Sequence, residues 1–454
     1  MWLGADVTAV AHDDADASTI AASVRVGSVS ARLVVDAALA RIAGHRTNAV
    51  VTMCAADARA AADGIDELIA RGVDPGPFAG VPFTVKDTIA VGGVRATGGS
   101  LLFADNVAGH DAEVVRRLRA AGAIVVGKTN CPEFALQPRT DNRIFGPTAH
   151  PRDATRSPGG SSGGCAAAVA GALVPFSIGG DYGGSVRYPA SCTGIYGLRP
   201  TWRAVPTTGH VPDPAPGTPR ARFQTIGPLA RTARDIGLVF DVMRGSPSVG
   251  VDLEIGRVAV VRNGWESTEA VAGAVDRVAD RFADAGYEVI DIDAGPFVEA
   301  AAVFAAWRAT DDYADLRALA AGREGDLTAH IAQLLATPPT PADLEPRLAA
   351  VARAVESLLS RTPIVVLPVA RVGVVGVDAT TVDIGGTTES IDALQVLAPS
   401  RAVSVLGLPA LAVPVGNGSD GFPVGVQLVG RARTERDLVG VATALVTGAS
   451  APPG

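Results

Sequence analysis

The sequence contains little cysteine and little charge for its length. Four of its 454 residues are cysteine, and charged residues make up 19% of the chain, against about 25% in a typical soluble protein. No two cysteines form a C-x-x-C pair, so neither a disulfide scaffold nor a zinc site of that kind is predicted. We expect reduced, mostly buried thiols at Cys54, Cys131, Cys165 and Cys192.

Basic clusters and unbroken apolar runs are also missing. The net charge is −8 and no block of lysine and arginine occurs, which argues against nucleic acid and anionic membrane surfaces as partners. The longest uncharged stretch, residues 157–180, is interrupted by two prolines and several glycines, so no membrane helix is predicted there. The N-terminal segment MWLGADVTAVAHDD lacks the basic start and apolar centre of a secretory signal, so a cytoplasmic location is expected.

The chain does contain a regular alternation of strand-like and helix-like segments, which predicts an α/β fold. Ser30 is a favourable cap for one predicted helix, and a second is expected to stop at Gly72. Strands are predicted at 81–87, 123–128, 256–263, 288–293, 362–368, 409–415 and 423–430, and helices at 111–122, 267–287, 297–361 (with breaks near Gly322 and Pro338) and 434–446.

Two clusters of glycine and serine lie about two dozen residues apart. The first, SPGGSSGG at 157–164, has the composition of a flexible linker. The second, at 183–185, follows a run of small apolar residues, which is typical of a packed core and does not suggest a joint between domains. The Pro/Gly-rich segment 205–223 is either a linker or a long surface loop near the functional site, and we favour the loop.

Residues 122–129, GAIVVGKT, match the G-x-x-x-x-G-K-[ST] pattern of a phosphate-binding loop. The pattern falls on β-branched residues that favour a strand, and a helical segment precedes it where a phosphate loop follows a strand. We therefore predict a strand followed by a loop. An ATP-binding protein is retained as an alternative to be tested.

Histidine is scarce, with six residues in the chain. A Ser-His-Asp triad needs a histidine base beside its serine, and Ser185 is followed by Val-Arg, which is not the sequence of a G-x-S-x-G nucleophile turn. His150 and His210 lie in polar loops, where a surface or supporting position is favoured over a catalytic one. No histidine stands at metal-ligand spacing from another ligand, so no metal is predicted.

Lys86 stands at the end of an apolar strand. Burial there would lower the pKa of the amine and leave it neutral enough to act as a base. The other interpretation is an ion pair with Asp87 or another carboxylate. The residues alone leave both roles of Lys86 open.

The second glycine-serine cluster, residues 183–185, has the features of an oxyanion site. Its successive backbone amides can point at one position, as an oxyanion requires, and the cluster ends in a serine.

Four segments, in this order, resemble the amidase signature family. They are GVPFTVKD, RSPGGSSGGCAAAVAGALVP, GGDYGGSVRYPASCTGIYGLRPT and GLPALAVPVGNGSDGFPVGVQLVGR. The resemblance covers about residues 29–445. It implies a single α/β/α domain, here residues 1–454 with a frayed tail at 450–454, around a large mixed twisted sheet. It also implies hydrolysis of a small or mid-sized carboxamide by a Ser–cis-Ser–Lys triad without a cofactor.

Carried over by motif, the resemblance places the nucleophile at Ser185, the bridging serine at Ser161 and the lysine base at Lys86. It implies proton transfer from Ser185 through Ser161 to Lys86 while Ser185 attacks the amide carbon. The oxyanion would then be held by the backbone amides of Tyr182, Gly183, Gly184 and Ser185.

Other residues of the motif are expected to support this site. Asp181 and Arg187 match the acid and the arginine that hold the nucleophile loop in shape, and Gly160 precedes the cis peptide of the bridging serine. The chain departs from the family at Gly180, where a threonine or serine is usual, and at Tyr182, where a smaller residue is usual. These departures leave the triad intact but change the shape of the pocket.

The resemblance leaves three interpretations of function. The leading one is an amidase that acts alone on a small-molecule amide. The second is the glutaminase subunit of a tRNA-dependent amidotransferase, whose nucleophile segment typically reads SIRQPA where this chain reads SVRYPA. The third is a catalytically weak binding protein on the same fold. Homodimers are common in the family. Arg220 and Arg222 are expected to be solvated loop residues rather than contacts to a substrate carboxylate.

Overall fold

The computed structural model describes residues 15–246, 256–392 and 394–447, so the predictions for the N-terminal signal and the tail lie outside the described residues. The strands are β1 Val50–Met53, β2 Pro82–Lys86, β3 Ile124–Thr129, β4 Phe176–Asp181, β5 Tyr196–Arg199, β6 Thr225–Ala230, β7 Arg257–Val260, β8 Glu288–Asp291, β9 Ile364–Pro368, β10 Thr381–Ile384, β11 Thr387–Ser390, β12 Ala410–Asn417 and β13 Pro423–Val429.

Helices lie between many of these strands along the chain. They are α2 Ala17–Arg25, α3 Ala31–Gly44, α4 Ala55–Ala70, α5 Glu113–Ala120, α6 Gly163–Ala170, α7 Arg187–Thr193, α8 Pro219–Phe223, α9 Ala233–Arg244, α10 Glu269–Asp284, α11 Gly295–Arg308, α12 Ala314–Ala320, α13 Ala329–Ala336, α14 Glu345–Arg361, α15 Ala398–Val405 and α16 Glu435–Thr447. Helices α11 to α14 follow one another without a strand between them. Short 3-10 turns are η1 Leu101–Phe103, η2 Glu133–Ala135, η3 Glu324–Asp326 and η4 Leu394–Leu397.

Eleven of the strands form one mixed sheet. Their order is β1-β3-β2-β4-β6-β5-β12-β13-β9-β7-β8, and β10 and β11 form a separate hairpin. Pairs such as β2–β3 and β2–β4 are parallel, whereas β4–β6 and β12–β13 are antiparallel. The predicted α/β fold around a large mixed sheet is therefore confirmed.

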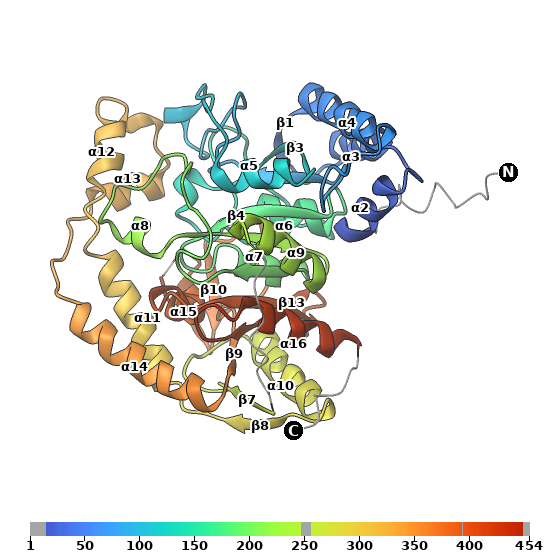
Figure 1. Cartoon of the computed structure of the whole chain (residues 1–454). Helices are drawn as coiled ribbons and strands as arrows, with labels where there is room; N and C mark the ends of the chain where they lie inside the picture. The colour runs from blue at the N-terminus through green and yellow to red at the C-terminus, as the bar shows by residue number, and fades with distance from the viewer. Residues whose placement is uncertain (1–14, 247–255, 393, 448–454) are drawn as a thin grey trace.

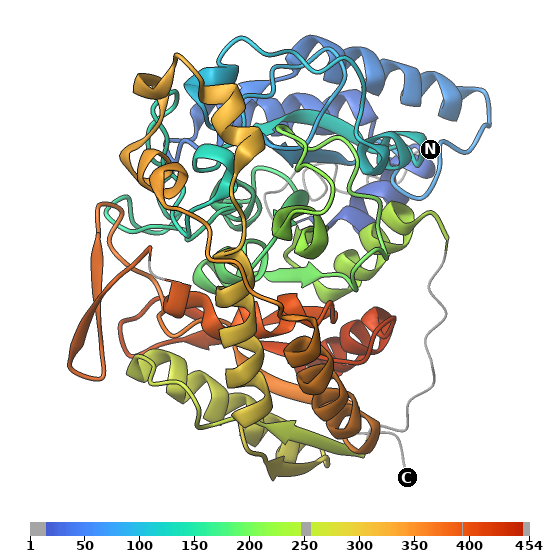
Figure 2. The same cartoon turned by 90° about the vertical axis from the view of Figure 1, so that its left-hand side faces the viewer.

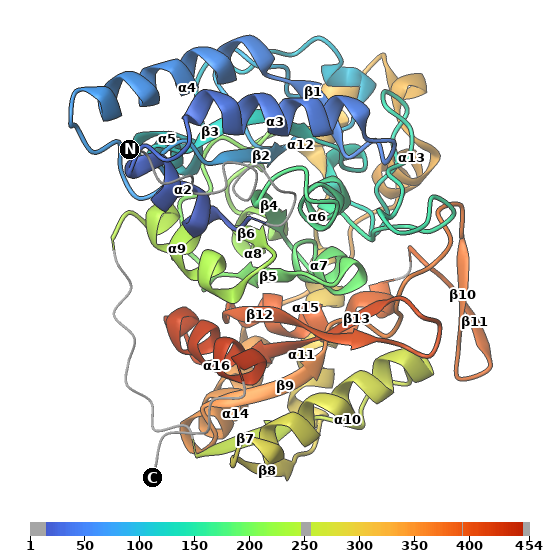
Figure 3. The same ribbon diagram turned by 90° about the vertical axis from the view of Figure 1, so that its right-hand side faces the viewer.

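Helices cover both faces of the sheet. Helices α11 and α14 lie on one side and α10 on the other (Figure 1), and two views from opposite sides agree (Figures 2 and 3). Phe83 of β2 stacks on Phe176 of β4 with ring centroids 5.0 Å apart, and both rings are fully buried. Burial of such apolar surface is the main force that holds helices and sheet together.

Local sequence signals explain most of the predicted elements. The hydroxyl of Ser30 accepts a hydrogen bond from Leu33 N (3.1 Å) and caps α3, and Gly72 follows α4 with a φ of +70°. The strand predicted at 123–128 is confirmed as β3, Ile124–Thr129, all of whose residues are buried. The long helical stretch from 297 contains an additional break at Tyr313, whose φ is +51°.

Several elements were absent from the sequence prediction. The buried strand β4 reads FSIGGD, so its glycines obscure its strand pattern. Helix α15 reads APSRAVSV, and its serines and valines have a lower helix propensity than alanine or leucine. The segment 205–223 is not a linker, because the strands on either side of it, β5 and β6, pair with each other in the sheet. It forms a loop that ends in helix α8.

The topology brings two of the predicted site segments together. Strands β2 and β4 are parallel neighbours, with Val85 opposite Ile178. Their carboxyl ends therefore lie at the same edge of the sheet, where the sites of such folds usually form. Lys86 ends β2, and the segment 182–185 directly follows β4.

The remaining predictions from composition concern cysteines and membranes. All four cysteines are buried and none forms a disulfide. Among the residues described, no helix has both the length and the apolar character needed to cross a bilayer.

Candidate active site

Lys86 is fully buried at the end of β2, and its partners are hydroxyl groups. Its Nζ atom lies 2.6 Å from Ser161 Oγ and 3.0 Å from Ser162 Oγ. Burial lowers the pKa of Lys86, although the nearby Cys131, Cys165 and Asp181 act in the opposite direction. The group can therefore shed its proton more readily than an exposed lysine.

Ser161 and Ser162 stand directly before α6, in the cluster that resembles a linker. The Gly160–Ser161 peptide is cis. A Cβ atom at Gly160 would lie 2.8 Å from the backbone carbonyl of Arg139, so no larger residue fits there without movement. Both serines are fully buried. Glycine here permits close contact between two stretches of backbone, and the segment is not a flexible tether.

Ser185 lies in the loop between β4 and α7. It is 9% exposed, and its hydroxyl forms no hydrogen bond within the described part of the chain. Its backbone oxygen accepts a hydrogen bond from Ser162 N (3.0 Å), which ties the two glycine-serine clusters together. Gly184 has a φ of +114°, and a Cβ there would lie 2.7 Å from that of Ser400, so this turn requires glycine.

The amides of this loop differ in their availability. Gly184 N donates to Asp181 Oδ1 (2.9 Å), so it is occupied. In the described chain the amides of Tyr182, Gly183 and Ser185 make no hydrogen bond. Of the four donors predicted for an oxyanion, three are thus free to meet a ligand.

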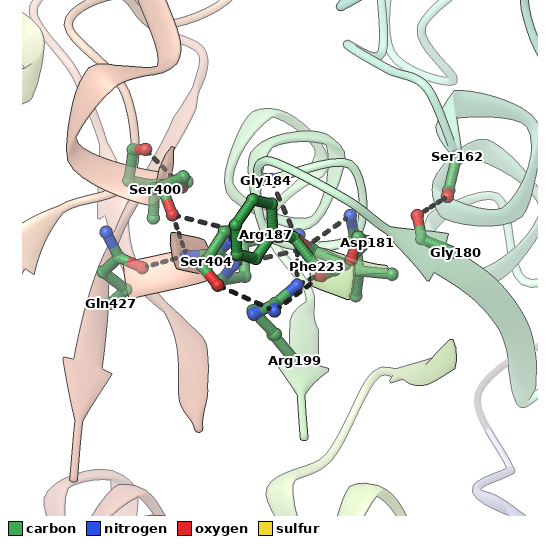
Figure 4. A network of polar contacts seen from close by, with 12 residues as sticks. Ser162, Gly180, Asp181, Gly184, Arg187, Arg199, Phe223, Ser400, Ser404 and Gln427 are labelled. Carbon is green, nitrogen blue, oxygen red and sulfur yellow. Dashed lines mark hydrogen bonds and ion pairs between the residues drawn. The ribbon is translucent and has the colours of Figure 1, made fainter. Parts of the chain in front are cut away.

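A buried network of charged groups holds the loop (Figure 4). Arg187 donates to both carboxylate oxygens of Asp181, at 2.9 and 3.1 Å, and also to Ser400 O and Gln427 Oε1. Arg199 donates to Asp181 from the other side, at 3.2 Å to Oδ1. Burial alone would raise the pKa of Asp181, but the two guanidinium groups hold it well below its usual range. The carboxylate therefore stays charged and orders the loop.

Lys86, Ser161 and Ser185 line one pocket. About 500 Å³ of space lies within it, part of it open to solvent, and the lining also includes Thr88, Phe134, Ala135, Leu136, Gly180, Tyr182, His210, Val211, Pro212, Pro214, Arg220 and Gln224. The segment 205–223 thus contributes to the wall, as predicted. No group of histidines, cysteines and carboxylates in the described residues is arranged to hold a metal ion.

For His150 and His210 a surface or a supporting position was expected, and the surface alternative is wrong. The two residues are 1% and 6% exposed. His150 contacts Cys192 O at 3.1 Å, whereas His210 lies in the pocket wall and is hydrogen bonded to Gln224. Burial, with the nearby charge of Lys86, lowers the pKa of His210 to about 3, so its ring is neutral. The sequence did not indicate that the two histidines are buried, because both lie in irregular segments and are covered by residues distant in sequence.

The prediction for Arg220 is also wrong. It is 5% exposed and pairs with Asp311 (3.0 Å) and Asp315 (2.5 Å), because helix α12 and the preceding loop fold over the segment 205–223. Its charge is thereby satisfied within the protein. Arg222 is partly exposed and pairs with Glu345, which agrees with a surface position.

The phosphate-loop pattern falls on strand β3. Its lysine, Lys128, is fully buried and lies 3.6 Å from Asp87 Oδ1 and 3.3 Å from Asp87 O. Between the two glycines, residues 124–126 belong to β3 and Ala123 N donates to Leu118 O, so no run of free loop amides is available to enclose a phosphate. The strand prediction is confirmed and the ATP-binding alternative is dropped.

Comparison with known proteins places the chain in a family. The Amidase family matches residues 33–439. The A subunit of the glutamyl-tRNA(Gln) amidotransferase from Carboxydothermus hydrogenoformans is 44% identical over 193 residues, which is 42% of this chain and 39% of that protein. The chain thus aligns with about half, or less, of the curated relatives it matches.

Two solved structures have a fold similar to that of this chain. A crystal structure of an amidase superposes with a TM-score of 0.86 at 25% identity, covering 96% of this chain and all of that one. The corresponding amidotransferase protein from Thermotoga maritima gives 0.65 at 26% identity, with 81% and 83% covered. With the match over 33–439, these findings show that the chain belongs to the amidase signature family.

Proposed function

We propose that this chain is an amidase that cleaves the C–N bond of a small or mid-sized carboxamide through an acyl-enzyme on Ser185. The observation that carries the proposal is the position of Lys86, a buried amine 2.6 Å from a buried serine hydroxyl in the pocket that also contains Ser185. Burial lowers the pKa of Lys86, as a base requires. We further propose that the chain forms a single catalytic domain.

The proposed reaction begins with neutral Lys86. It takes a proton from Ser161, which takes one from Ser185 as the Ser185 oxygen attacks the amide carbon. Negative charge then develops on the former carbonyl oxygen, and the free amides of Tyr182, Gly183 and Ser185 are its proposed donors. The proton returns through Ser161 to the leaving amine. Water, activated by the same groups, hydrolyses the ester and releases the carboxylate.

Ser161 and Ser185 need not be hydrogen bonded before a substrate binds. Ser185 Oγ has no partner in the described residues, and hydrogen bonds of catalytic groups often tighten only in the complex with substrate. The roles proposed for Asp181, Arg187 and Gly160 are structural: the ion pairs set the loop, and the glycine allows the close approach to Arg139.

A second candidate is the glutaminase component of an amidotransferase, because the matched curated relatives are proteins of that kind. Two observations favour the amidase that acts alone. The fold agrees over the full length of the amidase structure but over 83% of the amidotransferase protein, with a lower TM-score. Tyr188, at the position of the glutamine in SIRQPA, is 1% exposed and donates to Gly373 O, so its position is occupied by a core residue.

The purified chain, with no added protein, tests the choice. We expect release of ammonia or amine from a panel of aryl, alkyl and amino-acid amides, and loss of that release in Ser185→Ala. Turnover of glutamine alone, or turnover only when an amidotransferase partner is added, would favour the second candidate. Failure of a fluorophosphonate probe to react with Ser185 would favour a binding protein on the same fold.

A further inference from the structure

A second pocket is also lined by Ser185, but not by Lys86. About 390 Å³ of space lies within it, part of it open to solvent. It shares Ala135, Leu136, Tyr182 and Ser185 with the first pocket, and its other lining residues are Gln137, Pro138, Gly183, Phe304, Arg308, Asp392, Leu397 and Arg401. Both pockets therefore border the position where a substrate would be attacked by Ser185. The charged residues of this second pocket, which we call the arginine pocket, indicate what it holds.

Arg401 of α15 is the unusual member. Its side chain is 6% exposed, and its Nη1 atom is buried without a hydrogen-bond partner. Among the described residues, its guanidinium forms no ion pair or hydrogen bond. Burial, aided by the charge of Arg308, lowers the pKa of Arg401 to about 9, so it remains a cation at neutral pH. A buried cation without a counter-ion is costly unless a ligand supplies one.

The position of Arg401 is fixed by packing. Its guanidinium carbon lies 5.9 Å from the centre of the Phe304 ring. Its stem is close to the nucleophile loop, since a Cβ at Gly183 would lie 3.1 Å from Arg401 Cγ. The side chain is therefore held beside the residues that would bind the reacting carbonyl.

The other polar groups of the arginine pocket leave its positive charge unbalanced. Arg308 donates to Tyr313 Oη at 3.3 Å and adds a second cation. Asp392 is the acidic member, and its Oδ2 accepts from Arg139 at 3.2 Å and from Gln137. Its Oδ1 has no hydrogen-bond partner in the described part of the chain. Tyr182 also lines this pocket, and its hydroxyl is buried without a hydrogen-bond partner among the described residues, so it is a second unused donor.

Arg220 differs from Arg401 in its partners. Arg220 is equally buried and lines the first pocket together with Ser185, but two aspartates neutralise it. The protein thus supplies counter-ions where an arginine is structural. Arg401 has no counter-ion among the described residues, although it lines a pocket that borders Ser185.

We infer that Arg401, with the Tyr182 hydroxyl, binds a carboxylate of the substrate, so that the preferred amides carry a free carboxylate. The inference rests on the proposed amidase function. A guanidinium offers a planar pair of donors that matches a carboxylate, and charge-assisted hydrogen bonds of this kind are strong. The carboxylate belongs either to the acyl part or to the leaving amine, and the experiment separates the two.

The kinetic experiment compares pairs of amides that differ in one carboxylate. Succinamate against butyramide tests the acyl side, and N-acetylglycine against N-propylacetamide tests the leaving side. For wild type, kcat/KM for one charged amide should exceed that for its neutral counterpart. In Arg401→Leu the ratio of the charged to the neutral kcat/KM should fall by about 10- to 100-fold, the loss expected for a hydrogen bond to a charged group. Arg401→Lys should restore part of it.

A matched control is Arg222→Leu. This variant removes the same charge from a partly exposed arginine of α8 that lines neither pocket. Its ratio of charged to neutral kcat/KM should equal that of wild type. An unchanged ratio in Arg401→Leu, or an equal fall in both arginine variants, would overturn the inference.

A binding measurement keeps the inference separate from the proposed function. Glutarate should raise the Tm of wild type and of Arg222→Leu, but not that of Arg401→Leu, and neutral glutaramide should raise none. If glutarate binds through Arg401 but no amide is hydrolysed, the proposed function fails and the carboxylate site stands. If amides are hydrolysed and glutarate stabilises Arg401→Leu as much as wild type, the carboxylate site fails alone.

Folding of the variant is checked by its own Tm. Because Arg401 forms no hydrogen bond or ion pair with any described residue, its replacement by an apolar residue should leave the Tm of the free protein equal or higher. Should Arg401→Leu not fold, Arg401→Met keeps the unbranched stem and takes its place. A folded Arg401→Met that retains the wild-type ratio would also overturn the inference.

Discussion

Lys86 and Lys128 lie on the neighbouring parallel strands β2 and β3, and both are fully buried. Burial lowers the pKa of each. Their partners differ: the amine of Lys86 meets two serine hydroxyls in a pocket, whereas that of Lys128 lies 3.6 Å from the carboxylate of Asp87, outside the pocket. A buried lysine is thus suited to be a base where its neighbours are hydroxyls, and is a structural cation where its neighbour is a carboxylate.

The largest effect expected is that of Lys86→Met. Removal of the base should lower kcat/KM by about a thousandfold, within the usual range for general-base catalysis. The free energy of unfolding should not fall greatly, because Met fills much of the same volume and no buried partner charge is left behind. Amide turnover and urea unfolding measure the two. A normal kcat at neutral pH would exclude Lys86 as the base.

The two serines that contact Lys86 should differ in importance. Ser161→Ala should lower kcat/KM by about a hundredfold, since it breaks the proposed path from Ser185. Ser162→Ala should cost about tenfold or less, because Ser162 contacts Lys86 and Gly180 O but has no proposed part in the transfer. Side-by-side kinetics on one amide decide the order, and a larger loss in Ser162→Ala would reverse the assignment.

The pH profile should report Lys86 alone. The protonated amine cannot accept a proton, so kcat/KM should rise with pH until the lowered pKa of Lys86 is passed, by about tenfold per pH unit below it. Lys128→Met should show the same profile, because Lys128 is not a neighbour that shifts the pKa of Lys86. Rates recorded from about pH 5 to 9 test this. A kcat/KM that does not change with pH over this range would contradict the prediction, and so would a rise that occurs at a different pH in Lys128→Met.

The smallest effect on activity is expected from Lys128→Met, whose kcat/KM should change by less than about fivefold. Its effect should be on stability, with a loss of about 3–5 kcal/mol, because Asp87 would remain buried without its cation. Asp87 also accepts from Thr97 N and Oγ1, so Lys128→Met/Asp87→Asn should recover part of the loss. Urea unfolding measures both, and equal stability of wild type and Lys128→Met would refute the structural role.

The sequence predicted the fold well where local chemistry decides it. The residues themselves predict that Ser30 caps a helix, that the next helix ends at Gly72, and that the β-branched residues at 123–128 form a strand. The strand β4 was missed because glycine occupies two of its six positions, and its strand form depends on the neighbours with which it pairs.

The site was predictable only in part. Ser161, Ser185 and Lys86 stand in motifs, and all three line one pocket. The motifs did not show that Asp181 occupies the amide of Gly184. Nothing local marks Arg401 as unpaired or Arg220 as doubly paired, because their partners, or the lack of them, come from segments far away in sequence. The same holds for the difference between Lys86 and Lys128.

The most direct test of the account is the rate and position of reaction with a fluorophosphonate probe, followed by mass spectrometry. Wild type and Lys128→Met should each be modified once, at Ser185, and at similar rates. Lys86→Met should fold but react about a thousandfold more slowly. Modification at another residue, or an equal rate in Lys86→Met and wild type, would contradict the account.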